Sequence, residues 1–202
     1  MKIRTIGDRC LRVKSEEVEF DKERIGKLYK DMCDTMWEAN GIGLAAPQVG
    51  INERIIIIDE TTEEHGRYAH LMVNPKITWK SEEKVLFDEG CLSVPDQNGE
   101  VLRPKEIKLT FQNKDGKYKK WKLDGIAARV VQHEIDHLDG ITMYDREYKP
   151  QPLLTKKDKI GRNQKVEITN GTDTKTLKWK KAEPLVKQGD WSLSYGTAEV
   201  VE

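Results

Sequence analysis

The sequence of 202 residues has no long hydrophobic run, few cysteines and no excess of charge of either sign. No apolar stretch approaches the roughly 20 residues that a membrane-spanning helix requires, so we expect no membrane association. The three cysteines are an odd number, and the amino-terminal residues do not resemble a signal or transit peptide. These absences argue against a secreted disulfide scaffold and predict a cytoplasmic protein, which we expect to be monomeric.

The most informative motif is His133-Glu134-x-x-His137, which lies between Asp124 and Gly140. Histidines four positions apart lie one helical turn from each other, so both imidazoles can bind one cation beside Glu134. Asp124 is a suitable N-cap, and Gly140 a suitable left-handed residue after the helix. The histidines also continue an apolar face, where imidazoles without partners would be costly. The motif predicts a metal hydrolase; the alternative is a surface helix with an ordinary Glu ion pair.

A catalytic metal site of this kind needs a third protein ligand from elsewhere in the chain. The metzincin pattern requires a histidine where Met143 stands, which excludes that pattern. A thermolysin-like glutamate ligand could be Glu147 or Glu167, although neither stands in a recognisable helical context. Another source is Cys91, whose thiolate would bind tightly and bring negative charge to the site. The residues alone leave these sources open.

Three blocks of the chain resemble the peptide deformylase family. The family is marked, in this order, by GφGφAAxQ (φ apolar), EGCφS and QHExDHLxG. The corresponding segments here are GIGLAAPQ at residues 41–48, EGCLS at 89–93 and QHEIDHLDG at 132–140. The resemblance runs from about residue 1 to about Arg146. It implies an enzyme that removes the formyl group from the N-formyl-methionyl end of nascent polypeptides and releases formate.

The resemblance implies one metal ion bound by three residues: Cys91, His133 and His137. Glu134 would take a proton from the attacking water and later deliver it to the leaving amine. The side-chain amide of Gln48 and the backbone N–H of Leu92 would bind the developing oxyanion. Iron(II) is the implied metal in the cell, with zinc, nickel or cobalt as alternatives in purified protein.

The resemblance also implies an apolar slot for the methionine side chain and a strand edge that pairs with the substrate backbone. The residues matched to substrate binding are Ile42, Gly43, Gly90 and Val130. For Ile42 and Val130, ordinary core packing is the alternative. Glu89 and Arg103 match a pair that fixes the cysteine-bearing segment, whereas in isolation they would be interpreted as surface charges.

The expected fold class is α+β, with mostly antiparallel sheets packed around the metal-binding helix and a small β-rich carboxyl-terminal appendage. Apolar spacing predicts a helix over 22–39 capped by Asp21, and an apolar run predicts a buried strand over 55–58. Alternating residues on both sides of the Asp-Gly pair at 115–116 predict a hairpin over 107–123. The resemblance supplies the arrangement of these elements.

The chain departs from the family after Arg146, where prolines 150 and 152 end any helix. We expect three segments: a catalytic domain over 1–148, a linker over 149–164, and a small basic β-rich appendage over 165–202. Within the appendage, the pattern predicts strands that include Trp179, a turn at Asn170-Gly171, and a short helix over 182–187.

Residues 149–187 hold 11 Lys or Arg against 4 Asp or Glu, in a chain whose net charge is 0. One hypothesis is that this arm binds ribosomal RNA where formylated chains emerge, because phosphate attraction would raise the local enzyme concentration. The alternative is a solvated surface. The other function class is a non-enzymatic adaptor that binds ribosomes or RNA and holds a structural metal. This alternative requires Glu134 to be dispensable. A structural metal site would more often have four protein ligands.

Overall fold

The computed structural model describes residues 1–64, 66–148, 161–170, 173–188 and 191–193. The chain divides into two compact units, Met1–Tyr148 and Lys149–Glu202. Most of the predicted linker over 149–164 lies outside the described residues, and its described part forms a turn in which Gln164 N donates to Gly161 O. Within the described part of the chain, no helix has the length and apolar character needed to span a membrane.

The first unit combines helices with antiparallel strands. Its helices and 3-10 turns are η1 (Arg9–Arg12), α1 (Lys22–Glu38), η2 (Ala46–Val49), α2 (Gly125–Leu138) and α3 (Met143–Arg146). Its strands are β1 (Gly43–Ala45), β2 (Ile55–Asp59), β3 (Ala69–Lys80), β4 (Lys84–Cys91), β5 (Val94–Pro104), β6 (Glu106–Gln112) and β7 (Tyr118–Asp124).

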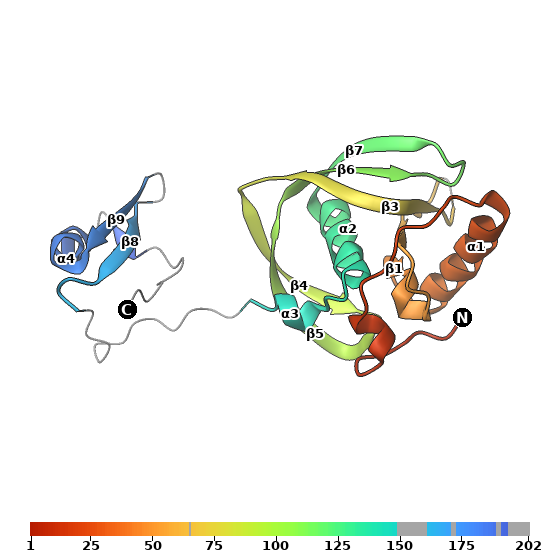
Figure 1. The fold of residues 1–202 in the computed structure, drawn as a ribbon, viewed down its shortest axis with the longest axis horizontal. Coiled ribbons are helices and arrows are strands. Elements are labelled where there is room, and N and C mark those ends of the chain that lie inside the picture. The colour runs from red at the N-terminus through yellow and green to blue at the C-terminus, as the bar shows by residue number, and fades with distance from the viewer. Residues whose placement is uncertain (65, 149–160, 171–172, 189–190, 194–202) are drawn as a thin grey trace. The chain divides into compact units, whose positions relative to one another are not determined.

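Two antiparallel sheets surround helix α2. One sheet has the order β1-β2-β3-β6-β7, and the other is the hairpin of β4 and β5. Figure 1 shows α2 inside the unit, with the large sheet on one side and the hairpin on another. Helix α2 contacts strands of both sheets. This arrangement confirms the predicted α+β class.

Helix α1 forms where the apolar spacing predicts it. The Asp21 side chain accepts a hydrogen bond from Arg24 N at 2.9 Å, which caps the first turn. Its buried face consists of Ile25, Leu28, Met32, Cys33, Thr35 and Met36. The apolar members of this face share one core cluster with residues of β1 and β2, so burial holds α1 against the edge of the large sheet.

Helix α2 buries its apolar face against the other side of the same sheet. Buried side chains of β6 at Ile107, Leu109 and Phe111 alternate along the strand, as predicted. They share a core cluster with four residues of α2: Ala128, Val131, Ile135 and Leu138. Because this face is fixed against the sheet, the two histidines of α2 are held on a different face.

The sequence predicts a capping residue at each end of α2, and the structure bears out one of these two predictions in full. Asp124 occupies the N-cap, but its side chain accepts no cap hydrogen bond; it is exposed and ends strand β7. At the other end Gly140 has φ +72°, the left-handed conformation predicted for it. A Cβ at this position would lie 2.8 Å from the carbonyl oxygen of Arg12, so glycine is required for close approach as well.

The second unit is small. It consists of β8 (Lys165–Thr169), β9 (Thr174–Lys178), α4 (Trp179–Gln188) and β10 (Ser192–Leu193), with antiparallel strands in the order β10-β8-β9. Ile168 and Ala182 are its buried apolar residues within the described ranges. The predicted turn includes Gly171, which lies outside the described residues.

Trp179 is not on a strand as predicted; it begins α4, three residues before the predicted helix start. The reason is tertiary. Trp179 N donates to Gln164 O at 2.7 Å, and Lys180 N donates to Arg162 O at 3.0 Å. Because the segment before β8 satisfies these first-turn N–H groups, the helix can begin earlier than its apolar spacing indicates.

Candidate metal centre

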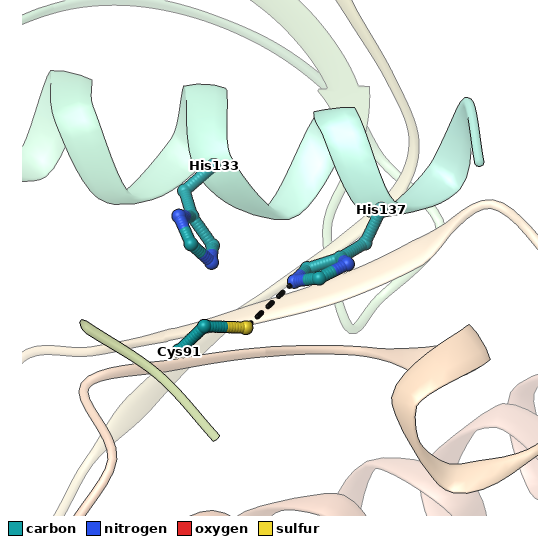
Figure 2. Close-up of side chains that lie close together, drawn as sticks. All are labelled: Cys91, His133 and His137. Carbon is teal, nitrogen blue, oxygen red and sulfur yellow. Dashed lines mark hydrogen bonds between the residues drawn. The ribbon is translucent and has the colours of Figure 1, made fainter. Parts of the chain in front are cut away.

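Three residues predicted as ligands lie together in the structure. Helix α2 presents His133 and His137 one turn apart, and strand β4 ends at Cys91 beneath them (Figure 2). One ligand atom from each residue lies within 4.8 Å of the others, and Cys91 Sγ is 3.2 Å from His137 Nε2. Among the described residues, neither Glu147 nor Glu167 belongs to this group.

The chemistry of this group fits a metal ion. Burial lowers the pKa of His137 well below its usual value, and neutral imidazole is the form that binds metals. Burial acts on His133 in the same direction, but hydrogen bonds to Cys91 and Glu89 outweigh it and raise the pKa to about 10. The group therefore favours a positive charge between its members, which a divalent cation supplies. One thiolate with two imidazoles suits zinc or iron(II).

Glu89 orients one of the two imidazoles. Its Oε2 atom lies 3.0 Å from His133 Nδ1, so that nitrogen donates to the carboxylate and Nε2 is left for the metal. Arg103 donates to the same carboxylate from Nε at 2.7 Å and from Nη2 at 3.0 Å. Burial raises the pKa of Glu89, but the bonds from His133 and Arg103 reverse this and lower it to about 2. Glu89 and Arg103 are buried, so interpreting them as surface charges would be wrong.

The network continues beyond this pair through residues that the sequence did not identify. Arg103 Nη1 donates to Asp136 Oδ2 at 2.7 Å, and Arg146 Nη2 donates to Asp136 Oδ1 at 2.8 Å. Arg129 Nη1 donates to Glu89 at 2.5 Å. One signal was available: Arg129 stands four residues before His133, and therefore on the same side of the helix.

Gln48 is held in one orientation beside the ligands. Its Oε1 atom accepts from Ala45 N at 2.8 Å, and its Nε2 atom donates to Ser93 Oγ at 3.1 Å. The same Nε2 lies 3.7 Å from Cys91 Sγ. Because the oxygen is already bonded to the backbone, the amide N–H groups must face the thiol side of the site. Leu92 directly follows Cys91 in the chain.

Glu134 is a buried carboxyl group with a free oxygen. Its Oε2 atom has no hydrogen-bond partner among the described residues. Burial raises the pKa of Glu134 to about 7. A Cβ at Gly43 would lie 2.5 Å from Glu134 Oε1 and 2.6 Å from Val130 Cγ1, so glycine is needed where β1 passes this carboxylate. The free oxygen and the raised pKa suit a group that exchanges protons near neutral pH.

A cavity of about 690 Å³ opens onto these groups. Its wall includes the following residues predicted for the site: Ile42, Gly43, Gln48, Glu89, Gly90, Cys91, Leu92, Val130, His133 and Glu134. The other two, His137 and Arg103, are buried and do not line it. Ile42 is 55 % exposed, which core packing does not explain, whereas Val130 also packs against the core cluster of α2.

Comparisons with known proteins agree on one family. The family model described as polypeptide deformylase matches residues 1–152. A peptide deformylase of Picosynechococcus sp. is 41 % identical over 146 residues, covering 72 % of this chain and 78 % of the relative. A peptide deformylase of Synechocystis sp. is 40 % identical over 161 residues, covering 80 % and 86 %.

Solved structures give the same result. The crystal structure of a probable peptide deformylase from Synechococcus phage S-SSM7 is 81 % identical, with a TM-score of 0.71, and the match covers 72 % of this chain and 98 % of that one. The peptide deformylase of Thermotoga maritima is 40 % identical with a TM-score of 0.67, covering 73 % and 97 %. The family match ends at residue 152, so it does not extend to β8, β9, α4 and β10.

Proposed function

Because this chain belongs to the polypeptide deformylase family, we propose a role for each group in its site. The protein is a hydrolase that removes the formyl group from the amino terminus of nascent polypeptides. The observation that supports the proposed roles is the group of Cys91, His133 and His137 beside the unpartnered carboxylate oxygen of Glu134, on the wall of one cavity.

The metal ligands are Cys91, His133 and His137, and we propose iron(II) as the ion in the cell. When bound, the ion supplies Lewis acidity to the formyl carbonyl and to a nearby water. Zinc, nickel or cobalt would suit the same donors in purified protein. Glu89 keeps the Nδ1 atom of His133 occupied, so the imidazole presents Nε2 to the ion.

Glu134 moves the proton in this scheme. Its free oxygen takes a proton from water as the water attacks the formyl carbon. The same carboxyl then delivers the proton to the nitrogen of methionine as the carbon–nitrogen bond breaks, which leaves formate and a free amino terminus. A pKa of about 7 suits both steps, because the group can accept and release a proton near neutral pH.

Gln48 and Leu92 stabilise the charge that develops on the formyl oxygen. The Gln48 amide is fixed by Ala45 N and Ser93 Oγ, so its donors need no reorganisation during the reaction. The backbone N–H of Leu92, next to Cys91, is the proposed second donor.

The substrate backbone is proposed to pair with β1, the edge strand of the large sheet. Ile42 O accepts from Asp59 N on the β2 side, while Ala45 N faces Gln48 on the other side. Because backbone groups alternate along a strand, those of Gly43 face away from β2 and can bind an extended peptide. Gly90 also lies on the cavity wall, and Ile42, Leu92 and Val130 form the apolar slot for methionine.

Formate release provides the test. The full chain, loaded with iron(II) under anaerobic conditions, should release formate from a formyl-methionyl peptide but no acetate from the acetyl-methionyl analogue. Chelation should stop the reaction, and iron(II) should restore it. Turnover that survives chelation, or equal cleavage of both peptides, would contradict the proposal.

We propose an appendage over 165–202, joined by a linker over 149–164 to a catalytic domain over 1–148. Residues 165–202 hold 6 Lys against 6 Asp or Glu, so the excess of basic residues belongs to 149–187 and not to the predicted appendage as a whole. Its described lysines include Lys178, Lys180 and Lys181, which are all exposed. Exposed lysines attract phosphates, so we propose that this appendage binds ribosomal RNA where formyl-methionyl chains emerge. We also propose that the protein acts as a monomer in the cytoplasm.

A further inference from the structure

Arg129 connects helix α2 to both strands of the β4–β5 hairpin. Its Nη2 atom donates to Val85 O in β4 at 2.6 Å, and its Nη1 atom donates to Val101 O in β5 at 3.0 Å. Its guanidinium carbon lies 5.3 Å from the ring centroid of Phe87, also in β4. Since β4 ends at Cys91, one side chain holds the cysteine-bearing hairpin against the helix that carries both histidines.

The same guanidinium completes the charge balance around Glu89. Arg129 Nη1 donates to Glu89 Oε1 at 2.5 Å, while Glu89 Oε2 is 3.0 Å from His133 Nδ1. Arg103 also bonds to Glu89, but it shares its charge with Asp136. Among the described residues, Glu89 is the carboxylate with which Arg129 forms an ion pair. Arg129 is 8 % exposed, so this pair is little screened by water.

We propose that Arg129 is a positioning residue for the metal centre. It holds Glu89 against His133 and holds the hairpin against α2, so that ligands from two separate elements converge. Lysine could supply the charge but not the planar fork that reaches one carboxylate and two carbonyls at once. This inference rests on the proposed assignment of Cys91, His133 and His137 as ligands.

The test measures Co²⁺ binding by the full chain after metal removal, followed by the absorption of the thiolate-bound ion and by competition with a chelator. Wild-type protein that binds one Co²⁺ with a thiolate band establishes the ligand assignment before any variant is compared. Absence of that band would contradict the proposed function, which keeps its failure distinct from failure of the Arg129 proposal.

Arg129→Leu should weaken Co²⁺ binding by about 10- to 100-fold and shift the Co²⁺ spectrum, the effect expected when a group supporting a ligand is lost. Arg129→Lys should lie between this variant and wild type. The matched control is Arg24→Leu, which removes an exposed guanidinium bonded to both carboxylate oxygens of Glu53 at 2.9 Å. The control should change the affinity less than about twofold, as expected for an exposed ion pair.

A double-mutant cycle with Glu89→Gln separates positioning from general stability. If Arg129 acts through Glu89, adding Arg129→Leu to Glu89→Gln should cost less than about threefold in Co²⁺ affinity, because the coupled pair is already broken. Additive losses would overturn the proposed action of Arg129 through Glu89. Folded Arg129→Leu with wild-type affinity and spectrum would also overturn it. If Arg129→Leu does not fold, Arg129→Lys replaces it in the same measurements. Unchanged Co²⁺ binding by Arg129→Lys would then overturn the proposal.

Discussion

The two units of this chain use charged residues in opposite ways. In the first, Glu89, Arg103, Arg129 and Asp136 are buried, and each bonds to specific partners around the metal ligands. In the second, the lysines of β8, β9 and α4 are exposed. A buried charge needs a partner of opposite charge at hydrogen-bond distance, because it has lost its contact with water. Exposed charges attract a partner through their summed field, to which each charge contributes little. Single substitutions should therefore have large effects in the first unit and small, cumulative effects in the second.

The largest effect is expected for Cys91→Ser. Loss of the thiolate removes one of three ligands, so Co²⁺ affinity and formate release should both fall below detection. Titration with Co²⁺ and a formate assay measure the two properties. Metal binding that survives intact would favour the thermolysin-like alternative, in which a glutamate supplies the third ligand.

Glu134→Gln should separate binding from chemistry. The amide has nearly the same shape but cannot take a proton from water, so turnover should fall by about 10²- to 10⁴-fold. Metal content should stay at one ion per chain, as measured by elemental analysis. Full turnover by this variant would mean that Glu134 is not the group that moves the proton.

Gln48→Leu should reduce kcat by about 10²-fold, the usual cost of one lost oxyanion donor. Steady-state kinetics on a formyl-methionyl peptide measure this loss. Ser93→Ala is the control, because it removes the partner of Gln48 Nε2 and leaves the amide in place. Equal losses in the two variants would mean that Gln48 acts through Ser93 and not on the substrate.

Gly43→Ala should move the Glu134 carboxylate, since the added Cβ would lie 2.5 Å from its Oε1 atom. A displacement of about 1 Å typically costs up to about 10²-fold in rate, so kcat should fall by about tenfold or more. Gly26→Ala is the matched control, because nothing lies within 4 Å of the added Cβ. A wild-type rate for Gly43→Ala would show that β1 yields without disturbing Glu134.

The smallest effect on catalysis is expected in the second unit. Replacing Lys178, Lys180 and Lys181 by Gln should lower salt-sensitive co-sedimentation with ribosomes. The slope of the logarithm of the binding constant against the logarithm of salt concentration should become shallower by about one for each lost phosphate contact. Formate release from a short peptide should change less than twofold, roughly the limit for exposed substitutions. The control neutralises three exposed lysines of the first unit: Lys117, Lys119 and Lys120. Equal losses in both variants would mean that net charge, not this unit, governs binding.

The sequence predicted local features of the first unit well. Asp21 caps α1, the buried residues of that helix follow the predicted spacing, and Gly140 adopts the left-handed conformation. These features depend on residues within one or two turns of each other. The strand predicted at Trp179 was wrong, because the start of α4 depends on carbonyl groups of Arg162 and Gln164, which lie before β8.

The sequence by itself determined the kinds of ligand and the one-turn spacing of His133 and His137, since both follow from residue type and helix geometry. Only the tertiary structure decided that Cys91 Sγ lies 3.2 Å from His137 Nε2, across 46 positions of the chain. It also decided that Glu134 is buried with a raised pKa. Burial and long-range contact arise from packing between separate elements, which no local pattern specifies.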